Sequence, residues 1–328
     1  MYFITVITLK MIRNILNKSW ILVFFAALLG CEEDINYDAF EQEEDRYFQL
    51  YMDAKYDTLQ PEPSGLYYIE DVAGNGLSPD SGDWVLINYL AYTIPDETVV
   101  DTYDEEWARD YNLYNSSVLY GPYKFQHGTE MEGLREGLSM MKEGGIARLI
   151  FKSDLGYGAE GFGNIGQFES LMYDVQLLKV IEDVEEWEQM KIDSFLAEHP
   201  QAYPIRDDET GSVMYHIPGL VGDSAQVSEG SNVEVFYTGQ LLDGRVFDSN
   251  AGEGSGMRIT IGEGDVIRGW DLGLKYFRYG GTGQLLIPHE LAYGAEGTKA
   301  SGTGKTAIPP YETLLFDIEV LISEPDID

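Results

Sequence analysis

The chain has 328 residues, 44% of them hydrophobic, which is enough for two domains that each bury a core. Its 57 acidic residues outnumber the 21 basic ones and give a formal net charge of −36 at pH 7. Such a charge repels phosphate backbones, so nucleic acid is excluded as the expected partner.

Residues 1–30 have the pattern of a bacterial export signal. Three basic residues precede an apolar run from Trp20 to Leu29, which is too short to span a membrane stably. The run ends in Leu-Leu-Gly-Cys31, which resembles the lipobox of bacterial lipoproteins, in which the cysteine is lipidated and becomes the mature N-terminus. We therefore expect a lipoprotein signal peptide at 1–30, lipidation of Cys31, and a lipid-anchored protein of the cell envelope, at the outer membrane or facing the periplasm.

Residues 31–60 are predicted to be an acidic tether followed by a helix. Aromatic and apolar residues recur at helical spacing from Phe40 to Tyr51. A second helical pattern, from Val184 to Ala197, predicts a linker helix at 183–201. Dimerisation through these helices is an alternative, although neither of them holds three heptads.

Residues 202–325 combine strand patterns with one short helix. Apolar residues alternate from Val233 to Tyr237 and again from Leu314 to Ile322, as on strands that are buried on one face. Between these strands, residues 268–276 have the pattern of a short helix with one apolar face. Strands around one helix predict an α+β domain.

Six motifs follow one another in this region. They are Tyr237-Thr-Gly, Asp243-Gly-Arg-Val-Phe-Asp-Ser, Gly264-Asp-Val-Ile-Arg-Gly-Trp270, Leu291-Ala-Tyr-Gly294, Ile308-Pro-Pro310 and Leu314-Leu-Phe-Asp-Ile-Glu319. Their order and spacing resemble those of the FKBP-type peptidyl-prolyl isomerases. The resemblance implies a twisted antiparallel sheet curled around the short helix. It also implies isomerisation of X-Pro bonds, whose rotation is otherwise slow enough to limit folding.

The resemblance further implies a proline pocket. Its residues would be Tyr237, Phe247, Asp248, Val266, Ile267, Trp270, Tyr293, Ile308 and Phe316. Trp270 would form the floor, while the Tyr293 hydroxyl and the Ile267 backbone N–H would donate hydrogen bonds to the substrate. Asp248 would hold a partner at the rim or interact with the rotated carbonyl.

We expect neither a metal nor another cofactor. An apolar site disfavours the planar, charge-separated amide more than the twisted transition state, so general acid-base chemistry is not required. The chain's four histidines are scattered along the sequence without the spacing of metal ligands.

An internal repeat has a period of about 148 residues. For example, Leu66-Tyr-Tyr-Ile69 aligns with Met214-Tyr-His-Ile217. We therefore expect two FKBP-like domains, a degenerate one at 61–182 and an isomerase domain at 202–325, each preceded by a helix.

The first copy departs from the pocket pattern. Val100, Leu134, Glu130-Met131 and Ile165-Gly-Gln167 replace Phe247, Trp270, Val266-Ile267 and Ile308-Pro-Pro310, whereas the polar and aromatic outline is kept by Tyr89, Asp101, Tyr157 and Tyr173. A Glu near an apolar pocket is costly unless it is solvated or paired. We therefore expect weak or absent isomerase activity in this copy.

Two loops distinguish the copies. Residues 102–120 of the first copy are rich in aromatic and acidic residues, and they would either form an exposed binding surface or fold back over the degenerate pocket. Residues 294–307 of the second copy are longer than in compact members of the family. We expect this second loop to overhang the second-copy pocket.

The sequence thus predicts an anchored isomerase that assists the folding of exported proteins, with catalysis mainly in the second domain. Its partners would be proline-containing unfolded or exported polypeptides, and the resemblance adds FKBP-type macrolides as inhibitors. The alternative is a non-catalytic chaperone, or a structural subunit of an envelope complex for secretion or motility.

Overall fold

The computed structural model describes residues 37–222, 224–301 and 303–321. The expected signal peptide and Cys31 lie outside the described residues. The chain divides into two units, the first ending at Glu43 and the second beginning at Glu44. None of the helices in the described part is both long enough and apolar enough to cross a membrane.

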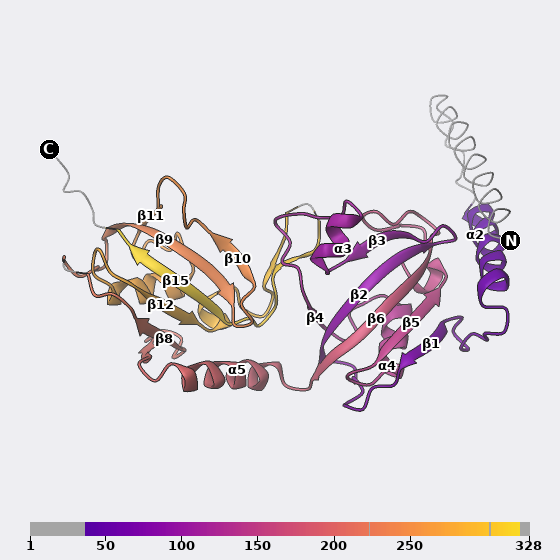
Figure 1. Cartoon of the computed structure of the whole chain (residues 1–328), viewed down its shortest axis with the longest axis horizontal. Coiled ribbons are helices and arrows are strands. Elements are labelled where there is room, and N and C mark those ends of the chain that lie inside the picture. The colour runs from indigo at the N-terminus through magenta and orange to yellow at the C-terminus, as the bar shows by residue number, and fades with distance from the viewer. Residues whose placement is uncertain (1–36, 223, 302, 322–328) are drawn as a thin grey trace, which may run out of the picture. The chain divides into compact units, whose positions relative to one another are not determined.

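The second unit contains one antiparallel sheet in each sequence repeat (Figure 1). The strands of the first sheet are β1 (Tyr67–Val72), β2 (Trp84–Ile94), β3 (Thr98–Thr102), β4 (Tyr123–Gln126), β5 (Ile146–Phe151) and β6 (Ser170–Ile181). Their order is β1-β5-β6-β2-β3, and β4 also pairs with β2. The helices of this repeat are α3 (Glu105–Asp110), α4 (Glu132–Met140) and the 3-10 turn η1 (Ser153–Leu155).

The second sheet repeats this arrangement. Its strands are β7 (Tyr203–Arg206), β8 (Val213–Pro218), β9 (Asn232–Leu241), β10 (Val246–Ser249), β11 (Met257–Thr260), β12 (Thr282–Ile287) and β15 (Leu314–Val320). The order β8-β12-β15-β9-β10, with β11 also on β9, matches the first sheet strand by strand, and β7 adds an edge. The α+β class and the duplication predicted from the sequence are confirmed.

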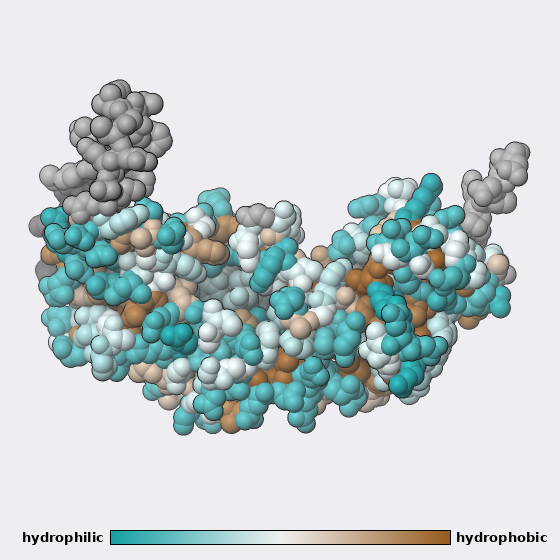
Figure 2. Space-filling model, turned by 180° about the vertical axis from the view of Figure 1, so that it is seen from behind, coloured by the Kyte–Doolittle hydropathy of each residue, from teal (hydrophilic) through white to brown (hydrophobic). Residues whose placement is uncertain are grey.

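The remaining elements connect or extend these sheets. They are α2 (Tyr37–Lys55), α5 (Val184–Glu198), α6 (Arg268–Gly273), the 3-10 turns η2 (Leu274–Tyr276) and η3 (His289–Leu291), and the small hairpin of β13 (Thr298–Lys299) and β14 (Thr306–Ile308). The last turns of α2 bury Phe48, Tyr51 and Met52 against the first sheet. Hydrophilic residues cover most of the face shown in Figure 2, as expected from the acidic composition.

In each domain a short helix lies directly on the sheet because two glycines face it. A Cβ on Gly133 of α4 would overlap the Phe151 ring, and one on Gly137 would overlap Leu149. The matching Gly269 and Gly273 of α6 are equally close to β12 side chains. Only glycine permits this backbone approach at the close packing density of a protein core.

Helix α5 lies at the junction of the two domains. Its Glu188 carboxylate is buried and interacts with the Lys124 ammonium from β4 at 3.3 Å. Lys124 in turn contacts the Glu312 carboxylate of the second domain at 2.7 Å. A buried charge is tolerated only when it is paired, so this cluster is satisfied when both domains and α5 are in place.

His216 on β8 is buried beside β7. Its Nδ1 and the Tyr203 hydroxyl share a hydrogen bond of 2.5 Å. The Phe277 ring contacts His216 edge-on at 4.7 Å. Burial lowers the pKa of His216 to about 4.

This histidine should make the stability of the second domain depend on pH. The unfolded chain protonates His216 below about pH 6.5 while the folded domain does not, so its contribution is complete above that pH and is lost progressively as the pH falls toward 4. We expect wild type to lose about 1.3 kcal/mol more unfolding free energy than His216→Phe between pH 7.5 and 5.5. Urea unfolding at both pH values measures the difference, and equal losses in the two proteins would refute it.

Candidate active site

The centre of the second-domain site is a group of three rings from three elements. Trp270 of α6 meets Tyr237 of β9 at 5.0 Å between ring centroids and Phe316 of β15 at 5.2 Å, both edge to face. Trp270 and Phe316 are almost completely buried, whereas Tyr237 is half-buried. Edge-to-face packing fixes the ring planes, so the rings form a rigid apolar surface.

The remaining apolar candidates surround this group. Phe247 of β10 packs edge-on against Phe316 at 5.6 Å, and Gly239 of β9 permits this contact because a Cβ there would overlap both rings. Val266 and Ile267 precede α6, with Ile267 as its N-cap residue, and pack against the same core. Ile308 ends β14 and is buried in that core.

Two tyrosines and a carboxylate form the polar rim. The Tyr237 hydroxyl donates to Asp248 Oδ2 at 2.5 Å, and Asp248 is exposed. Burial, followed by the hydrogen bond to Asp248, raises the pKa of Tyr237, and burial and the charge of Asp248 raise that of Tyr293. Both hydroxyls therefore remain protonated and able to donate at neutral pH. Tyr293 is 39% exposed and accessible to a ligand.

Seven of the nine candidate residues thus belong to one hydrophobic core, Asp248 joins them through Tyr237, and the charge of Asp248 acts on Tyr293. The floor contains one unusual polar atom, because Trp270 Nε1 is buried and has no hydrogen-bond partner among the described residues. The described part of the chain also contains no group of three or more His, Cys, Asp or Glu side chains that could hold a metal ion.

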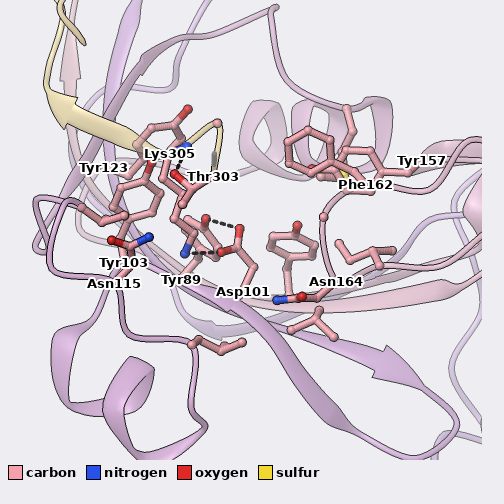
Figure 3. A pocket seen from close by; sticks show the side chains of 18 of the residues that line it. Tyr89, Asp101, Tyr103, Asn115, Tyr123, Tyr157, Phe162, Asn164, Thr303 and Lys305 are labelled. Carbon is pink, nitrogen blue, oxygen red and sulfur yellow. Dashed lines mark hydrogen bonds and ion pairs between the residues drawn. The ribbon is translucent and has the colours of Figure 1, made fainter. Parts of the chain in front are cut away.

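The corresponding region of the first domain is a cavity of 560 Å³ (Figure 3). Tyr89 donates to Asp101 Oδ2 at 2.6 Å, as Tyr237 does to Asp248 in the second copy. Val100 and Leu134 line the cavity at the positions of Phe247 and Trp270. Since both side chains are smaller than the rings they replace, the cavity has no aromatic floor.

Glu130 at this cavity is paired rather than free. Its carboxylate lies 2.5 Å from His127 Nδ1, and its second oxygen accepts from the Gly128 backbone N–H at 2.7 Å. Burial alone would raise the pKa of Glu130, but these hydrogen bonds outweigh it and the pKa is lowered. The sequence reading missed this pair, although the two residues are only three positions apart.

The insertion at 102–120 partly covers the cavity and is partly exposed. Tyr103 is buried and stacks on Tyr123 at 4.5 Å, and both rings line the cavity. Trp107 and Tyr111 stack on each other at 5.6 Å and are exposed. One part of the segment therefore folds back over the degenerate pocket, and another part is an exposed aromatic surface. Each of the two alternatives left open by the sequence thus describes one part of it.

The loop at 294–307 differs from the expectation. It forms the β13–β14 hairpin, and its tip at Thr303, Gly304 and Lys305 lines the cavity of the first domain. Lys305 Nζ contacts Asp101 Oδ1 at 2.5 Å. The sequence reading missed these residues because no local pattern indicates a contact with a partner about 200 positions away.

Two sequence comparisons show which proteins this chain resembles. The family model for FKBP-type peptidyl-prolyl cis-trans isomerase matches residues 76–178 and 223–321, together more than half of the chain. The probable FKBP-type peptidyl-prolyl cis-trans isomerase of Haemophilus influenzae is 37% identical over 133 residues, which cover 40% of this chain and 51% of that protein. The match thus spans about half the length of this relative.

A shorter relative is covered more completely. The FK506-binding protein of Neisseria meningitidis serogroup C is 44% identical over 93 residues, 28% of this chain and 80% of that protein. The crystal structure of FkpA from Escherichia coli aligns with a TM-score of 0.37 and 26% identity, over 52% of this chain and 72% of that chain. The family model matches once in each domain, and the chain therefore belongs to the family of FKBP-type peptidyl-prolyl cis-trans isomerases.

Proposed function

We propose that the protein is a peptidyl-prolyl cis-trans isomerase that assists the folding of exported proteins, with catalysis mainly in the second domain. The observation that carries this proposal is the ring group of Trp270, Tyr237 and Phe316 beneath a rim with Asp248 and Tyr293. The first domain keeps the rim pair Tyr89 and Asp101 but lacks the aromatic floor.

The floor would act on the electronic structure of the prolyl amide. The planar amide is charge-separated and gains most from water, whereas the twisted amide at the top of the barrier has less double-bond character. A proline ring on Trp270, with Phe247 and Ile308 at its sides, would be shielded from water. The planar state therefore loses more stabilisation than the twisted state, and the barrier falls.

The rim would orient the substrate chain. The Tyr293 hydroxyl is accessible and remains protonated at neutral pH, so it can donate to a substrate carbonyl. The Asp248 carboxylate accepts from Tyr237, which fixes its position next to the apolar surface. No proton transfer to or from the substrate is needed.

We propose that Cys31 anchors the protein to a membrane of the cell envelope through attached acyl chains. The apolar run before Cys31 and the Leu-Leu-Gly that precedes it support this assignment. The partners would be proline-containing polypeptides that fold after export, and macrolides of the FKBP type would inhibit the second domain.

One observation favours a second candidate function. The cavity of the first domain is intact without an aromatic floor, and stacked aromatic side chains of the insertion are exposed nearby. These features suit a chaperone, or a subunit of an envelope complex for secretion or motility, that binds polypeptides without turnover.

The floor tryptophan tests the catalytic assignment. Trp270→Leu installs the residue that the first copy has at this position, and we expect kcat/KM on an X-Pro tetrapeptide to fall by at least about tenfold, or roughly 1.4 kcal/mol of transition-state stabilisation. Phe277→Leu is the matched control, because it removes a buried ring from the same core beside His216, away from the rim. Unchanged activity in Trp270→Leu would rule out catalysis at this site.

The same variant distinguishes the second candidate function. A protein that only binds polypeptides would suppress aggregation of an unfolded client equally well as wild type and as Trp270→Leu, and wild type would show no isomerase activity.

The anchor has its own test. We expect the full-length protein to incorporate radiolabelled palmitate and to sediment with membranes when it is expressed in a bacterium, because attached acyl chains hold a soluble domain at a bilayer. Cys31→Ser should lose both properties. Labelling and sedimentation that persist in Cys31→Ser would show that the anchor lies elsewhere.

A further inference from the structure

The β13–β14 hairpin belongs to the second domain, but its tip completes the cavity of the first domain. Figure 3 shows Lys305 and Thr303 on one side of Asp101, and Tyr157 and Phe162 on the other. The cavity wall is therefore built from both domains.

The hairpin is anchored by several directed contacts. The Lys305 ammonium pairs with Asp101 and donates to the Thr102 carbonyl at 2.7 Å. The Thr306 backbone N–H donates to the Tyr103 hydroxyl at 2.8 Å, and the Leu119 N–H donates to the Thr306 carbonyl at 3.1 Å. Such a set of charged and backbone partners defines one docked position.

The base of the same hairpin belongs to the second-domain site. Ile308, the last residue of β14, is a candidate pocket residue and pairs with Thr298 across the hairpin, and the candidate Tyr293 directly precedes the loop 294–307. Gly297 lies so close to the Ile308 carbonyl that a Cβ there would overlap it. A displacement of the hairpin would therefore displace Ile308 as well.

The chemistry of the cavity indicates what it can hold. Lys305 neutralises Asp101, and the Glu130 carboxylate is held by hydrogen bonds to His127 and to the Gly128 N–H, so neither carboxylate is left without a partner. The remaining lining consists mostly of tyrosine rings and aliphatic side chains, with the carboxamides of Asn112, Asn115 and Asn164. These groups fit an apolar side chain and the neutral peptide groups beside it.

The size agrees with such an occupant. Ligand pockets commonly measure about 300–1,000 Å³. The 560 Å³ of this cavity is within that range. It can hold a short segment of polypeptide.

We propose that this cavity binds an uncharged, apolar polypeptide segment that need not contain proline, and that the bound segment holds the β13–β14 hairpin in place through contacts with Thr303 to Lys305. Because Ile308 is both the last residue of β14 and a candidate pocket residue, binding in the first domain is coupled to catalysis in the second. The coupling to catalysis deepens the proposed function and rests on it.

The sign of the coupling follows from the geometry. A ligand stabilises the docked hairpin only if it binds the docked state more tightly than the undocked state. Coupling between two sites commonly changes the affinity of one ligand by about 5–150-fold. An occupant that touches Lys305 gains these contacts only when the hairpin is docked. Occupancy and docking therefore favour each other.

Full-length chains with single substitutions provide the test. Lys305→Ala and Asp101→Asn remove the ion pair from either side, and Lys299→Ala removes an exposed lysine of the same hairpin as the matched control. The probe is the capped, proline-free peptide acetyl-Ala-Leu-Phe-Ala-amide. The first readout is hydrogen exchange at the backbone amides of β14, which does not depend on activity.

We expect the peptide to slow exchange in β14 about fivefold or more in wild type and Lys299→Ala. Lys305→Ala and Asp101→Asn should exchange faster and respond little to the peptide. The response should persist in Trp270→Leu, because that substitution changes the second-domain pocket. A response that Trp270→Leu abolishes, or that Lys305→Ala retains in full, would overturn the proposal.

The second readout is kcat/KM on the X-Pro tetrapeptide. We expect saturating probe to change it in wild type and Lys299→Ala, and to have no such effect in Lys305→Ala. If wild type catalyses but the probe has the same effect on all four proteins, the coupling is refuted while the proposed function stands. If wild type does not catalyse, the proposed function fails and hydrogen exchange alone decides whether the cavity binds the peptide.

Discussion

The close approach of a short helix to the sheet is the constraint on which both domains depend. Gly269 and Gly273 let α6 lie on β12 with no side chain between them, and Gly133 and Gly137 do the same for α4 on β5. Trp270 stands directly after the first glycine of α6, so this packing places its ring beneath β9 and β15. Leu134 holds the same position in the first domain. The packing of the helix on the sheet thus does not depend on which residue follows the first glycine. The first copy keeps both glycines but has Leu134 where the second copy has Trp270.

The fold and the second-domain site could be predicted because short motifs specify them. The Gly-Trp270 and Asp248 motifs each place a side chain through local backbone structure, and the alternation at Val233 and Val235 identifies the strand beside them. The hairpin contact could not be predicted in this way. Lys305 and Thr102 are 203 positions apart, and an exposed loop rich in Gly, Lys and Thr reads as solvated until its partner is known. The pair of His127 and Glu130 lies between these two cases. The two residues are close in sequence, but no local pattern indicates that their side chains meet in the folded chain.

Two kinds of contact join the domains, with different physical consequences. The buried cluster of Lys124, Glu188 and Glu312 costs desolvation, so it contributes more to a specific arrangement than to net stability. The contact of Lys305 with Asp101 is more exposed than this cluster. The hairpin that carries Lys305 lines the first-domain cavity at its tip and ends at Ile308 in the second-domain core. Because the second domain supplies part of the wall of the first-domain cavity, the two copies are linked by a contact that does not depend on catalysis in the first copy.

The central proposal is that X-Pro isomerisation takes place mainly in the second domain. Titration of full-length wild type with an FKBP-type macrolide, at protein concentrations well above the dissociation constant, measures this most directly. We expect isomerase activity to fall linearly and to be almost completely lost at one equivalent of macrolide per chain. Activity that falls by only about half at one equivalent, or that largely persists when the second domain is saturated, would assign comparable catalysis to the first domain and contradict this proposal.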